Sequence, residues 1–455
     1  MSDEQRPNIL FILTDDLGWG DVGFHGSPIR TPNLDDLASQ SVELAQHYVC
    51  PVCTPTRTCF MTGRHPGRFG RHATHPSNAP VMPDGYESIA VSLRNAGYAT
   101  GLFGKWHLGS SPEFNPHNYG FDASYGSLAG GVDPYNHCYK RGEFSKTWHR
   151  NGERVDERGH VTDLIVREAV EWIEGRAGPW FCYVPFTAVH TPIKPPQQWL
   201  ARYAGEAFDE DPDKDRSFAK YAAYTSHMDW AVGELLEVLH RRCEREETLV
   251  VFASDNGAAW ESMKDPLNYP GHQTGYPRLG SNLPYRGHKG QMYEGGIRTP
   301  TLVHWPTVLE PGKVSGAMHM VDWMPTLTKL VGYTPAEDPQ WDGVDAWDLI
   351  RGERPDLGDR PLYWNLNHNR FAVRQGDWKL IVRENKEPRE EELYNIAADP
   401  YEEQDVAAEN AETVTRLSEV LAAQRKDDDA SRRPDVPDNA TLMNPGMKKP
   451  AAAAY

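Results

Sequence analysis

A short segment around residue 53 contains the residue types of an activated nucleophile. Residues 53–57 read Cys-Thr-Pro-Thr-Arg. Pro55 suits the first turn of a helix, where its missing N–H costs nothing, and Thr54 is suited to cap that helix. Cys53 would then lie at the positively polarised start of the helix, with Arg57 one turn further along. This position favours an anionic ligand and an activated nucleophile.

A second group of polar residues comes at the ends of four strand-like runs. The runs are residues 8–14, 100–107, 180–186 and 248–254, and helical patterns separate them. Runs this rich in apolar residues are typical of strands buried on both faces. Open parallel α/β sheets place their ligand sites at the carboxyl ends of such strands. We therefore expect these polar groups to converge on one crevice beside the nucleophile: Asp15, Asp16, Lys105, His107, His190, Asp255 and Asn256.

Four of these residues offer only oxygen atoms as metal ligands: Asp15, Asp16, Asp255 and Asn256. Three carboxylates without a cage of cysteine and histidine suit one hard divalent cation, with Ca²⁺ preferred over Mg²⁺. Taken alone, each acid or amide is explained equally well by a solvated turn. Lys105 and His107 taken alone would likewise be a surface lysine and a structural histidine. Such explanations do not account for the whole set.

The cysteines leave two other interpretations open. Residues 50–53 read Cys-Pro-Val-Cys, the C-x-x-C pattern of thiol–disulfide enzymes, and a cysteine between a strand and a helix can simply belong to the core. Redox pairs of this kind occur early in a small thioredoxin-like βαβ unit, and nothing else in the sequence indicates one. The six cysteines are sparse and irregular, which argues against a disulfide framework: Cys50, Cys53, Cys59, Cys138, Cys182 and Cys243.

The chain is strongly acidic overall. Its 455 residues carry a formal net charge of −18, which makes it a poor candidate for binding nucleic acid or an anionic membrane surface. An anionic substrate would therefore need a local cationic pocket. The first apolar run, residues 9–13, is far too short for a signal peptide or a membrane span. We expect a cytoplasmic protein, or a periplasmic or secreted one if a leader was removed.

The elements that position these residues form an α/β pattern. Helices are expected at residues 34–44, 86–98, 161–174 and 218–242, with a further strand at 301–305. Their alternation with the four runs predicts a large, mixed and mostly parallel sheet flanked by helices. Beyond residue 338, short strands joined by Asn and Gly turns predict a smaller antiparallel sheet. Its strands are expected at 362–365, 370–374, 378–382 and 392–394, followed by a helix at 412–425.

This change of pattern divides the chain into three parts. We expect a catalytic domain at residues 1–337, a C-terminal α+β subdomain of antiparallel sheet and helix at 338–426, and a tail at 427–455. The tail is charged and then rich in Pro and Ala, so it is either flexible or an arm that packs on a neighbour, which leaves a homo-oligomer open.

Several of these motifs resemble those of the type I sulfatases of the alkaline phosphatase superfamily. The segment 53–57, together with Thr-Gly-Arg at 62–64, resembles their maturation signature. Residues 283–300 resemble their stretch with a pocket lysine, here Lys289, ahead of an aromatic-Glu-Gly-Gly sequence. The likeness extends from residue 7 to about residue 426 and is nearest to arylsulfatase B-type enzymes, the N-acetylgalactosamine 4-sulfatases. It implies an alkaline phosphatase-like catalytic domain. The other segments that carry it are residues 319–327, 341–345, 372–381 and 392–400.

The resemblance also implies a mechanism. A formylglycine-generating enzyme would oxidise Cys53 to formylglycine, whose hydrate attacks the sulfur of a sulfate ester. Ca²⁺ would be held by the four oxygen-bearing residues together with the modified residue 53. The resemblance assigns Arg57 to the diol of residue 53 and His107 to its deprotonation. It assigns Lys105 and Lys289 to the sulfate oxygens and His190 to the leaving-group oxygen.

Two segments are candidates for binding the remainder of the substrate. Residues 126–141 and 258–284 are long, rich in Gly, aromatic and hydrogen-bonding residues, and include Trp260 and His272. Loops of this length are commonly functional, although loops packed on the surface explain them equally well. Residues of these types fit a sulfated sugar as easily as a sulfated phenol. The resemblance to the N-acetylgalactosamine 4-sulfatases favours a sulfated carbohydrate over another small-molecule sulfate ester.

Other functions remain open at this point. The same nucleophile would serve hydrolysis of phosphate diesters or phosphonate monoesters, as in relatives of the alkaline phosphatase superfamily. An unmodified Cys53 or a blocked pocket would leave an inactive pseudo-sulfatase that binds sulfated glycans. A two-zinc phosphatase is disfavoured because the chain lacks Ser or Thr at the nucleophile position and an obvious His-rich second metal site.

Overall fold

A ten-stranded sheet forms the centre of the protein. The computed structural model describes residues 6–139, 146–262 and 275–436, and the strands in this part follow the order β11-β2-β10-β9-β1-β8-β4-β5-β6-β7. The four strands predicted from the apolar runs lie side by side at its centre and are parallel. The predicted class, a mixed and mostly parallel α/β sheet, is confirmed. The bounds of these four strands are Asn8–Thr14 (β1), Ala99–Lys105 (β4), Trp180–Pro185 (β8) and Thr248–Ser254 (β9).

Shorter strands extend the sheet on both sides. On the β9 side, β10 is antiparallel to its neighbours and β11 is parallel to β2, while on the β4 side β5 is parallel and β6 and β7 are antiparallel. A separate two-stranded pair joins β3 to β12. The bounds are Val42–Leu44 (β2), His47–Tyr48 (β3), Ala123–Ser127 (β5), Trp148–Arg150 (β6), Glu153–Arg154 (β7), Leu302–His304 (β10), Gly312–Val314 (β11) and Met318–His319 (β12).

Helices cover both faces of the sheet, because alternate residues of β1 enter opposite cores. Ile9 and Phe11 pack with α2, α3, α8 and α9, whereas Leu10 and Ile12 pack with α1, α4 and α6. No helix in the described part of the chain is both long and apolar enough to cross a membrane. The helix bounds are Pro32–Ser39 (α1), Cys53–Thr62 (α2), Ile89–Asn95 (α3), Val161–Glu174 (α4), Gln197–Leu200 (α5), Pro212–Arg241 (α6), Glu294–Ile297 (α7), Trp323–Leu330 (α8), Trp347–Ile350 (α9) and Ala411–Arg425 (α10).

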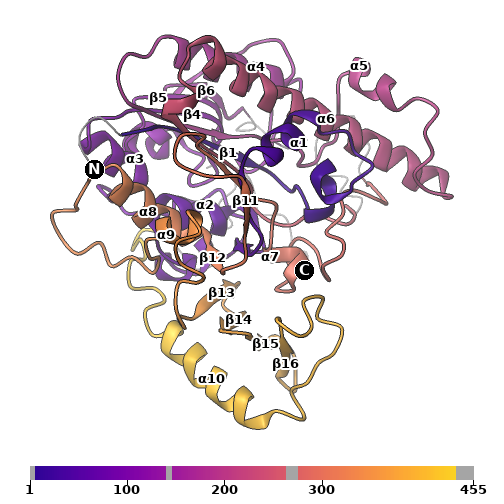
Figure 1. Ribbon diagram of the computed structural model, residues 1–455, viewed down its shortest axis with the longest axis vertical. Helices are drawn as coiled ribbons and strands as arrows, with labels where there is room; N and C mark the ends of the chain where they lie inside the picture. The colour runs from indigo at the N-terminus through magenta and orange to yellow at the C-terminus, as the bar shows by residue number, and fades with distance from the viewer. Residues whose placement is uncertain (1–5, 140–145, 263–274, 437–455) are drawn as a thin grey trace.

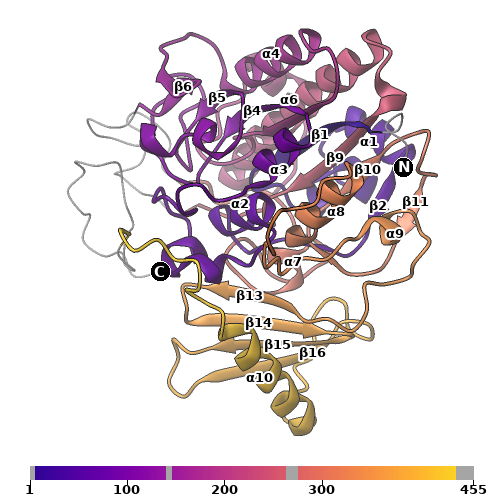
Figure 2. The same ribbon diagram turned by 90° about the vertical axis from the view of Figure 1, so that its left-hand side faces the viewer.

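The predicted small sheet lies at one end of the molecule, with α10 on its outer face (Figures 1 and 2). Its four strands are antiparallel, and the face away from α10 packs on residues of β3, the α2 N-terminus and α7, with Trp364 fully buried between them. Residues 427–436 of the predicted tail lie against the larger part of the chain, where Arg433 donates to the Met82 carbonyl over 3.0 Å. The strands are Leu362–Leu366 (β13), Arg370–Gln375 (β14), Trp378–Arg383 (β15) and Glu390–Asn395 (β16).

A buried ionic network joins the small sheet to α7. The Nζ atom of Lys379 on β15 lies 2.7 Å from Oε1 of Glu294 and 2.6 Å from Oε1 of Glu402, and all three side chains are fully buried. The backbone N–H of Glu294 also donates to Glu402 over 2.6 Å. Breaking one partner of such a network leaves an uncompensated buried charge, which is strongly destabilising.

Two local predictions are wrong. The helix expected at 34–44 ends at Ser39, and Val42–Leu44 forms strand β2 because it pairs with both β10 and β11. Thr54 does not cap α2, because the helix begins two residues earlier than predicted, at Cys53, and its N-cap is Val52. The Thr54 hydroxyl instead lies 3.3 Å from each ring nitrogen of His107.

Candidate active site

The structure brings the predicted residues together at the carboxyl ends of the central strands. Asp15 and Asp16 follow β1, Asp255 and Asn256 follow β9, and Lys105 is the last residue of β4. Helix α2 places its first residue, Cys53, beside them: the donor atoms of Asp15, Cys53 and Asp255 all lie within 4.8 Å of one another. The predicted convergence of these residues is therefore observed, and the role of each residue stays a prediction.

Each carboxylate of the site is paired with a cation. Lys105 Nζ lies 2.7 Å from Asp15 Oδ2. Arg57 donates to Asp255 Oδ2 from Nε over 3.2 Å and from Nη2 over 2.8 Å, and its Nη1 donates to the Lys105 carbonyl over 2.8 Å. The four side chains of these two pairs are almost completely buried. The pairs therefore act in a medium of low polarity, where their attraction is strong.

Lys289 reaches the site from a loop rather than from a strand end. Its Nζ lies 2.7 Å from Asp16 Oδ1 and 2.8 Å from Oδ2. The loop is fixed by backbone hydrogen bonds, from Lys289 N to the Ala258 carbonyl over 3.0 Å and from Gly290 N to the Pro51 carbonyl over 2.7 Å. The loop is thus held between the segments that follow Asn256 and precede Cys53.

The oxygen atoms of the site fit a hard cation. Asp15 Oδ1 and Asn256 Oδ1 are buried and have no hydrogen-bond partner among the described residues. Buried polar atoms are rarely left unpaired, and a divalent cation would satisfy both oxygens. Asp16 lies next to them and accepts a hydrogen bond from Asn256 Nδ2 over 2.8 Å. The residues present therefore suit a metal held by Asp15, Asp16, Asp255 and Asn256.

The charges shift the pKa values of the acids in opposite directions. Burial alone would raise the pKa of Asp16, but the positive charge of Lys289 and the proximity of His190 hold it well below its usual range. Burial, together with repulsion from Asp15, raises the pKa of Asp255 to about 6. A cation bound between these acids would remove that repulsion and favour the charged carboxylates.

Cys53 is not poised to react as a thiolate. Burial raises the pKa of its thiol even though the charges of Lys105 and Lys289 oppose the shift. Reactive cysteines of redox enzymes instead have lowered pKa values. In addition, the sulfur of Cys50 lies 3.5 Å from that of Cys59 in α2. These features disfavour the thiol–disulfide interpretation of residues 50–53.

Both histidines of the site are neutral in this arrangement. Burial, and then the charges of Lys105 and Arg57, hold the pKa of His107 well below its usual value. Burial and the charge of Lys289 lower the pKa of His190 to about 3. His190 Nδ1 lies 2.6 Å from the Thr191 carbonyl and so carries the proton, which leaves the lone pair of Nε2 free, 3.9 Å from Asp16.

Gly130 contributes to the site without having been predicted as a site residue. A Cβ atom at this position would lie 2.0 Å from Nε2 of His107, so glycine is needed for the ring to lie where it does. His107 itself has a φ of +61° and Asp16 a φ of +65°, a strained conformation that non-glycine residues adopt mostly at functional sites. The Gly-Gly pair at 130–131 within the predicted loop was the available signal.

We expect Gly130→Ala to reduce kcat/KM for a sulfate ester by about 10- to 100-fold, because displacing a catalytic group by about 1 Å has effects of this size. The Michaelis–Menten constants of the purified variant provide the measurement. Gly312→Ala is the matched control, since a Cβ atom at that position would meet no other atom within 4 Å. Equal losses in both variants would contradict a specific role of Gly130.

Trp260 and His272 were predicted to bind the rest of the substrate, and the described residues include only Trp260. Trp260 is 64% exposed, and its ring lies edge-to-face with that of His288, next to Lys289, at a centroid distance of 6.2 Å. His272 lies outside the described residues. An exposed indole is suited to stack on a sugar ring or another flat apolar face.

Known proteins share this sequence and this fold. The family profile described as Sulfatase matches residues 7–333, and that described as N-sulphoglucosamine sulphohydrolase, C-terminal, matches residues 287–427. Arylsulfatase J of Mus musculus is 32% identical over 396 residues, which are 83% of this chain. The chain spans only 62% of that relative's length.

Two further matches cover a larger share of the similar protein's length. N-acetylgalactosamine-6-sulfatase of Homo sapiens is 32% identical over 398 residues, 82% of this chain and 71% of that protein. The crystal structure of Ps i-CgsB in complex with k-i-k-neocarrahexaose superimposes with a TM-score of 0.82 at 31% identity, over 94% of this chain and 95% of that one. This chain belongs to the sulfatase family, whose members are sulfuric ester hydrolases.

Proposed function

We propose that this chain hydrolyses sulfate monoesters, using a formylglycine made from Cys53 and a Ca²⁺ ion bound beside it. The observation that carries the proposal is the environment of Cys53. Its sulfur lies within 4.8 Å of carboxylate oxygens of Asp15 and Asp255, and the charges of Lys105 and Lys289 act on it from the same crevice. One residue thus lies between a candidate cation site and two fixed ammonium groups.

Formylglycine and Ca²⁺ would each supply one property. As formylglycine, residue 53 would provide a hydroxyl of its hydrate as the nucleophile, and Ca²⁺ would provide the positive charge that favours ionisation of that hydroxyl. The fit of Ca²⁺ rests on the donor atoms, which are oxygens only and include two buried oxygens without a hydrogen-bond partner among the described residues.

The side chains of the chain itself would bind and orient the sulfate. Lys105 and Lys289 are held in place by ion pairs with Asp15 and Asp16, so their charges need little reorganisation when negative charge moves onto the sulfate oxygens. Arg57 is fixed by its hydrogen bonds to Asp255 and to the backbone, next to the start of α2. It is therefore positioned to orient the nucleophile.

The histidines have distinct proposed positions. His190 presents Nε2 to the site at the level of Asp16, where, once it carries a proton, it would donate to the leaving-group oxygen. His107 packs against Thr54 and Gly130 on the other side of the α2 N-terminus, where it would accept the proton of the nucleophile. Its neutral form, favoured by burial and by the neighbouring cations, is the form that accepts a proton.

A mass spectrum combined with a substrate comparison tests the proposal. The chain is co-expressed with a formylglycine-generating enzyme, and the peptide containing residue 53 is expected to carry the aldehyde. The modified protein should then hydrolyse an aryl sulfate with a higher kcat/KM than a bis-aryl phosphate or an aryl phosphonate. Aldehyde with the opposite preference would favour phosphodiester or phosphonate hydrolysis, and an intact thiol would favour a binding protein.

Metal removal gives a second measurement. Because Asp15 and Asn256 each have a buried oxygen free to coordinate, exhaustive chelation should lower kcat of the modified protein by about 100-fold or more. Added Ca²⁺ should restore kcat more completely than Mg²⁺, since Mg²⁺ keeps its water ligands more firmly. Unchanged activity after chelation, with calcium shown to be absent by elemental analysis, would contradict a catalytic metal.

We further propose that the substrate is a sulfated carbohydrate. The support is the sugar named for two of the similar proteins, an N-acetylgalactosamine-6-sulfatase and a complex with a neocarrahexaose, together with the exposed ring of Trp260, which packs on His288, the residue before Lys289. Trp260→Ala should raise KM for the best sulfated oligosaccharide by about 5- to 30-fold, because stacked aromatic contacts of about 1–2 kcal/mol are lost. KM for a small aryl sulfate should change little, and equal changes for both substrates would contradict the assignment.

A further inference from the structure

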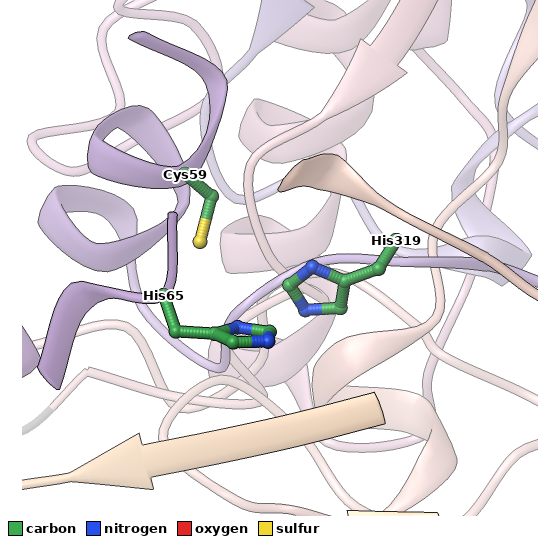
Figure 3. Close-up of side chains that lie close together, drawn as sticks. All are labelled: Cys59, His65 and His319. Atoms are coloured by element: carbon green, nitrogen blue, oxygen red, sulfur yellow. The ribbon is translucent and has the colours of Figure 1, made fainter. Parts of the chain in front are cut away.

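A second group of potential metal ligands lies in the core, apart from the oxygen atoms of the active site. It consists of Cys59 in α2, His65 just after that helix, and His319 at the end of β12, and Figure 3 shows the three side chains turned toward one another. One donor atom from each residue lies within 4.8 Å of the other two. We call this group the Cys59 cluster.

The imidazoles of the Cys59 cluster have unused nitrogen atoms. His65 is 3% exposed and His319 is 0% exposed, yet His65 Nδ1 and His319 Nε2 have no hydrogen-bond partner among the described residues. Leaving a buried donor or acceptor unpaired is costly, and such atoms in a native structure call for an explanation. Burial lowers the pKa of His65 to about 4 and holds that of His319 well below its usual value, and the neutral imidazole is the form that binds a metal.

We propose that the Cys59 cluster is a structural Zn²⁺ site. Thiolate sulfur and neutral imidazole are the ligands that zinc prefers, whereas Ca²⁺ takes oxygen. A fourth ligand is at hand, because the sulfur of Cys50 lies 3.5 Å from that of Cys59. Two thiolates of a tetrahedral zinc site, each about 2.3 Å from the metal, are about 3.7 Å apart. The Cys59 cluster provides three ligands, and Cys50, whose sulfur is not within 4.8 Å of all three cluster atoms, would complete a Cys₂His₂ set by moving toward the two imidazoles.

Binding would require small and identifiable changes. Each thiol would release its proton as its sulfur bonds to the metal. His319 would move its proton to Nδ1, which at present accepts a hydrogen bond from Val321 N over 3.3 Å. That exchange would set two N–H groups against each other, so the Val321 N–H would have to turn away from the ring. The donor atoms would also have to draw together to about 3.5 Å.

The location suggests what such a site would do. Helix α2 begins at Cys53 and carries Cys59 two turns later, so zinc bound to Cys59 and His319 would tie the nucleophile's helix to β12. The site is fully enclosed, so zinc would have to enter while the chain folds. The inference does not depend on the proposed sulfatase activity, because the site can be tested in an inactive variant.

The test uses Cys53→Ala, which removes the thiol that lies among the active-site carboxylates. This variant is produced in medium supplemented with zinc or, separately, with cobalt, and is dialysed against a chelator. We expect about one zinc ion per chain by elemental analysis. The cobalt form should show the thiolate-to-cobalt charge-transfer band and the visible bands of a tetrahedral site.

Substitutions assign the ligands. In the Cys53→Ala background, Cys59→Ser and His319→Gln should each lose the zinc and the charge-transfer band, whereas Cys182→Ser, at a buried cysteine on β8, should keep both. A Cys53→Ala protein without zinc, or one whose cobalt spectrum lacks the thiolate band, would overturn the proposal even if the ligand variants fail to fold. Zinc retained equally by all variants would place the metal elsewhere and would also overturn it.

Discussion

Replacing Cys53 by alanine should abolish sulfate-ester hydrolysis while the chain remains folded. Alanine occupies less space than cysteine and keeps the start of α2, but it removes the atom from which formylglycine is made. Removing a covalent nucleophile lowers kcat by about 10⁶-fold in a well-studied protease, so we expect a loss of at least about 10⁴-fold here. The measurement is kcat/KM for an aryl sulfate, with both proteins co-expressed with a formylglycine-generating enzyme and compared by circular dichroism.

A second buried cysteine provides the control. Cys182 lies on β8, and its side chain enters the core on the α4 and α6 side of the sheet. Cys182→Ala therefore removes a buried thiol without touching the crevice and should retain activity. If Cys53→Ala retained full activity, the proposed nucleophile would be wrong. If both variants lost activity equally, the loss would reflect the fold.

Replacing Lys289 by alanine should have the next largest effect. Its ammonium group lies 2.7 Å from Asp16 Oδ1, and this contact keeps the pKa of Lys289 above its usual value although burial acts against the charged form. Removing one fixed charge that stabilises developing negative charge typically reduces kcat by about 10²- to 10³-fold. We expect a loss of this size with sulfate esters, together with a raised KM.

Lys329 is the matched surface lysine for this experiment. Its side chain is 73% exposed and pairs with Asp345 on the solvent side, so Lys329→Ala should leave kcat and KM within about twofold, as is usual for exposed pairs. Lys289→Arg separates charge from shape, because it keeps the charge but not the compact ammonium. Similar kinetics for Lys289→Ala and Lys329→Ala would remove Lys289 from the pocket.

The central strands could be predicted because each is specified by its own residues. The run Asn8–Thr14 is apolar at every position after its first residue except the last, and such a run is stable only between two covered faces. The short outer strands could not be predicted in this way. Val42–Leu44 is a strand because β10 and β11 pair with it on both sides, and those partners come more than 250 residues later in the chain.

Part of the site could be predicted as well, because several of its residues end strands that are specified locally. Asp15, Asp255 and Lys105 stand at the ends of strands that the sequence identifies, so their meeting follows from the topology of a parallel sheet. Gly130 was missed as a site residue because its importance depends on how close the His107 ring approaches, which only the folded chain determines. Nothing in the sequence relates His65 to His319 either, so the approach of their rings could not be predicted.

The buried network of Glu294, Lys379 and Glu402 has a consequence for how such enzymes can be recombined. Lys289 precedes Glu294 by five residues, so the helix that anchors the pocket lysine's loop is itself held by a lysine from the small sheet. In a chimera that joins this large domain to a small sheet without the matching lysine, Glu294 would lose its buried partner. An unpaired buried charge would then lie next to the segment that carries Lys289. The large domain and the small sheet are therefore best exchanged together.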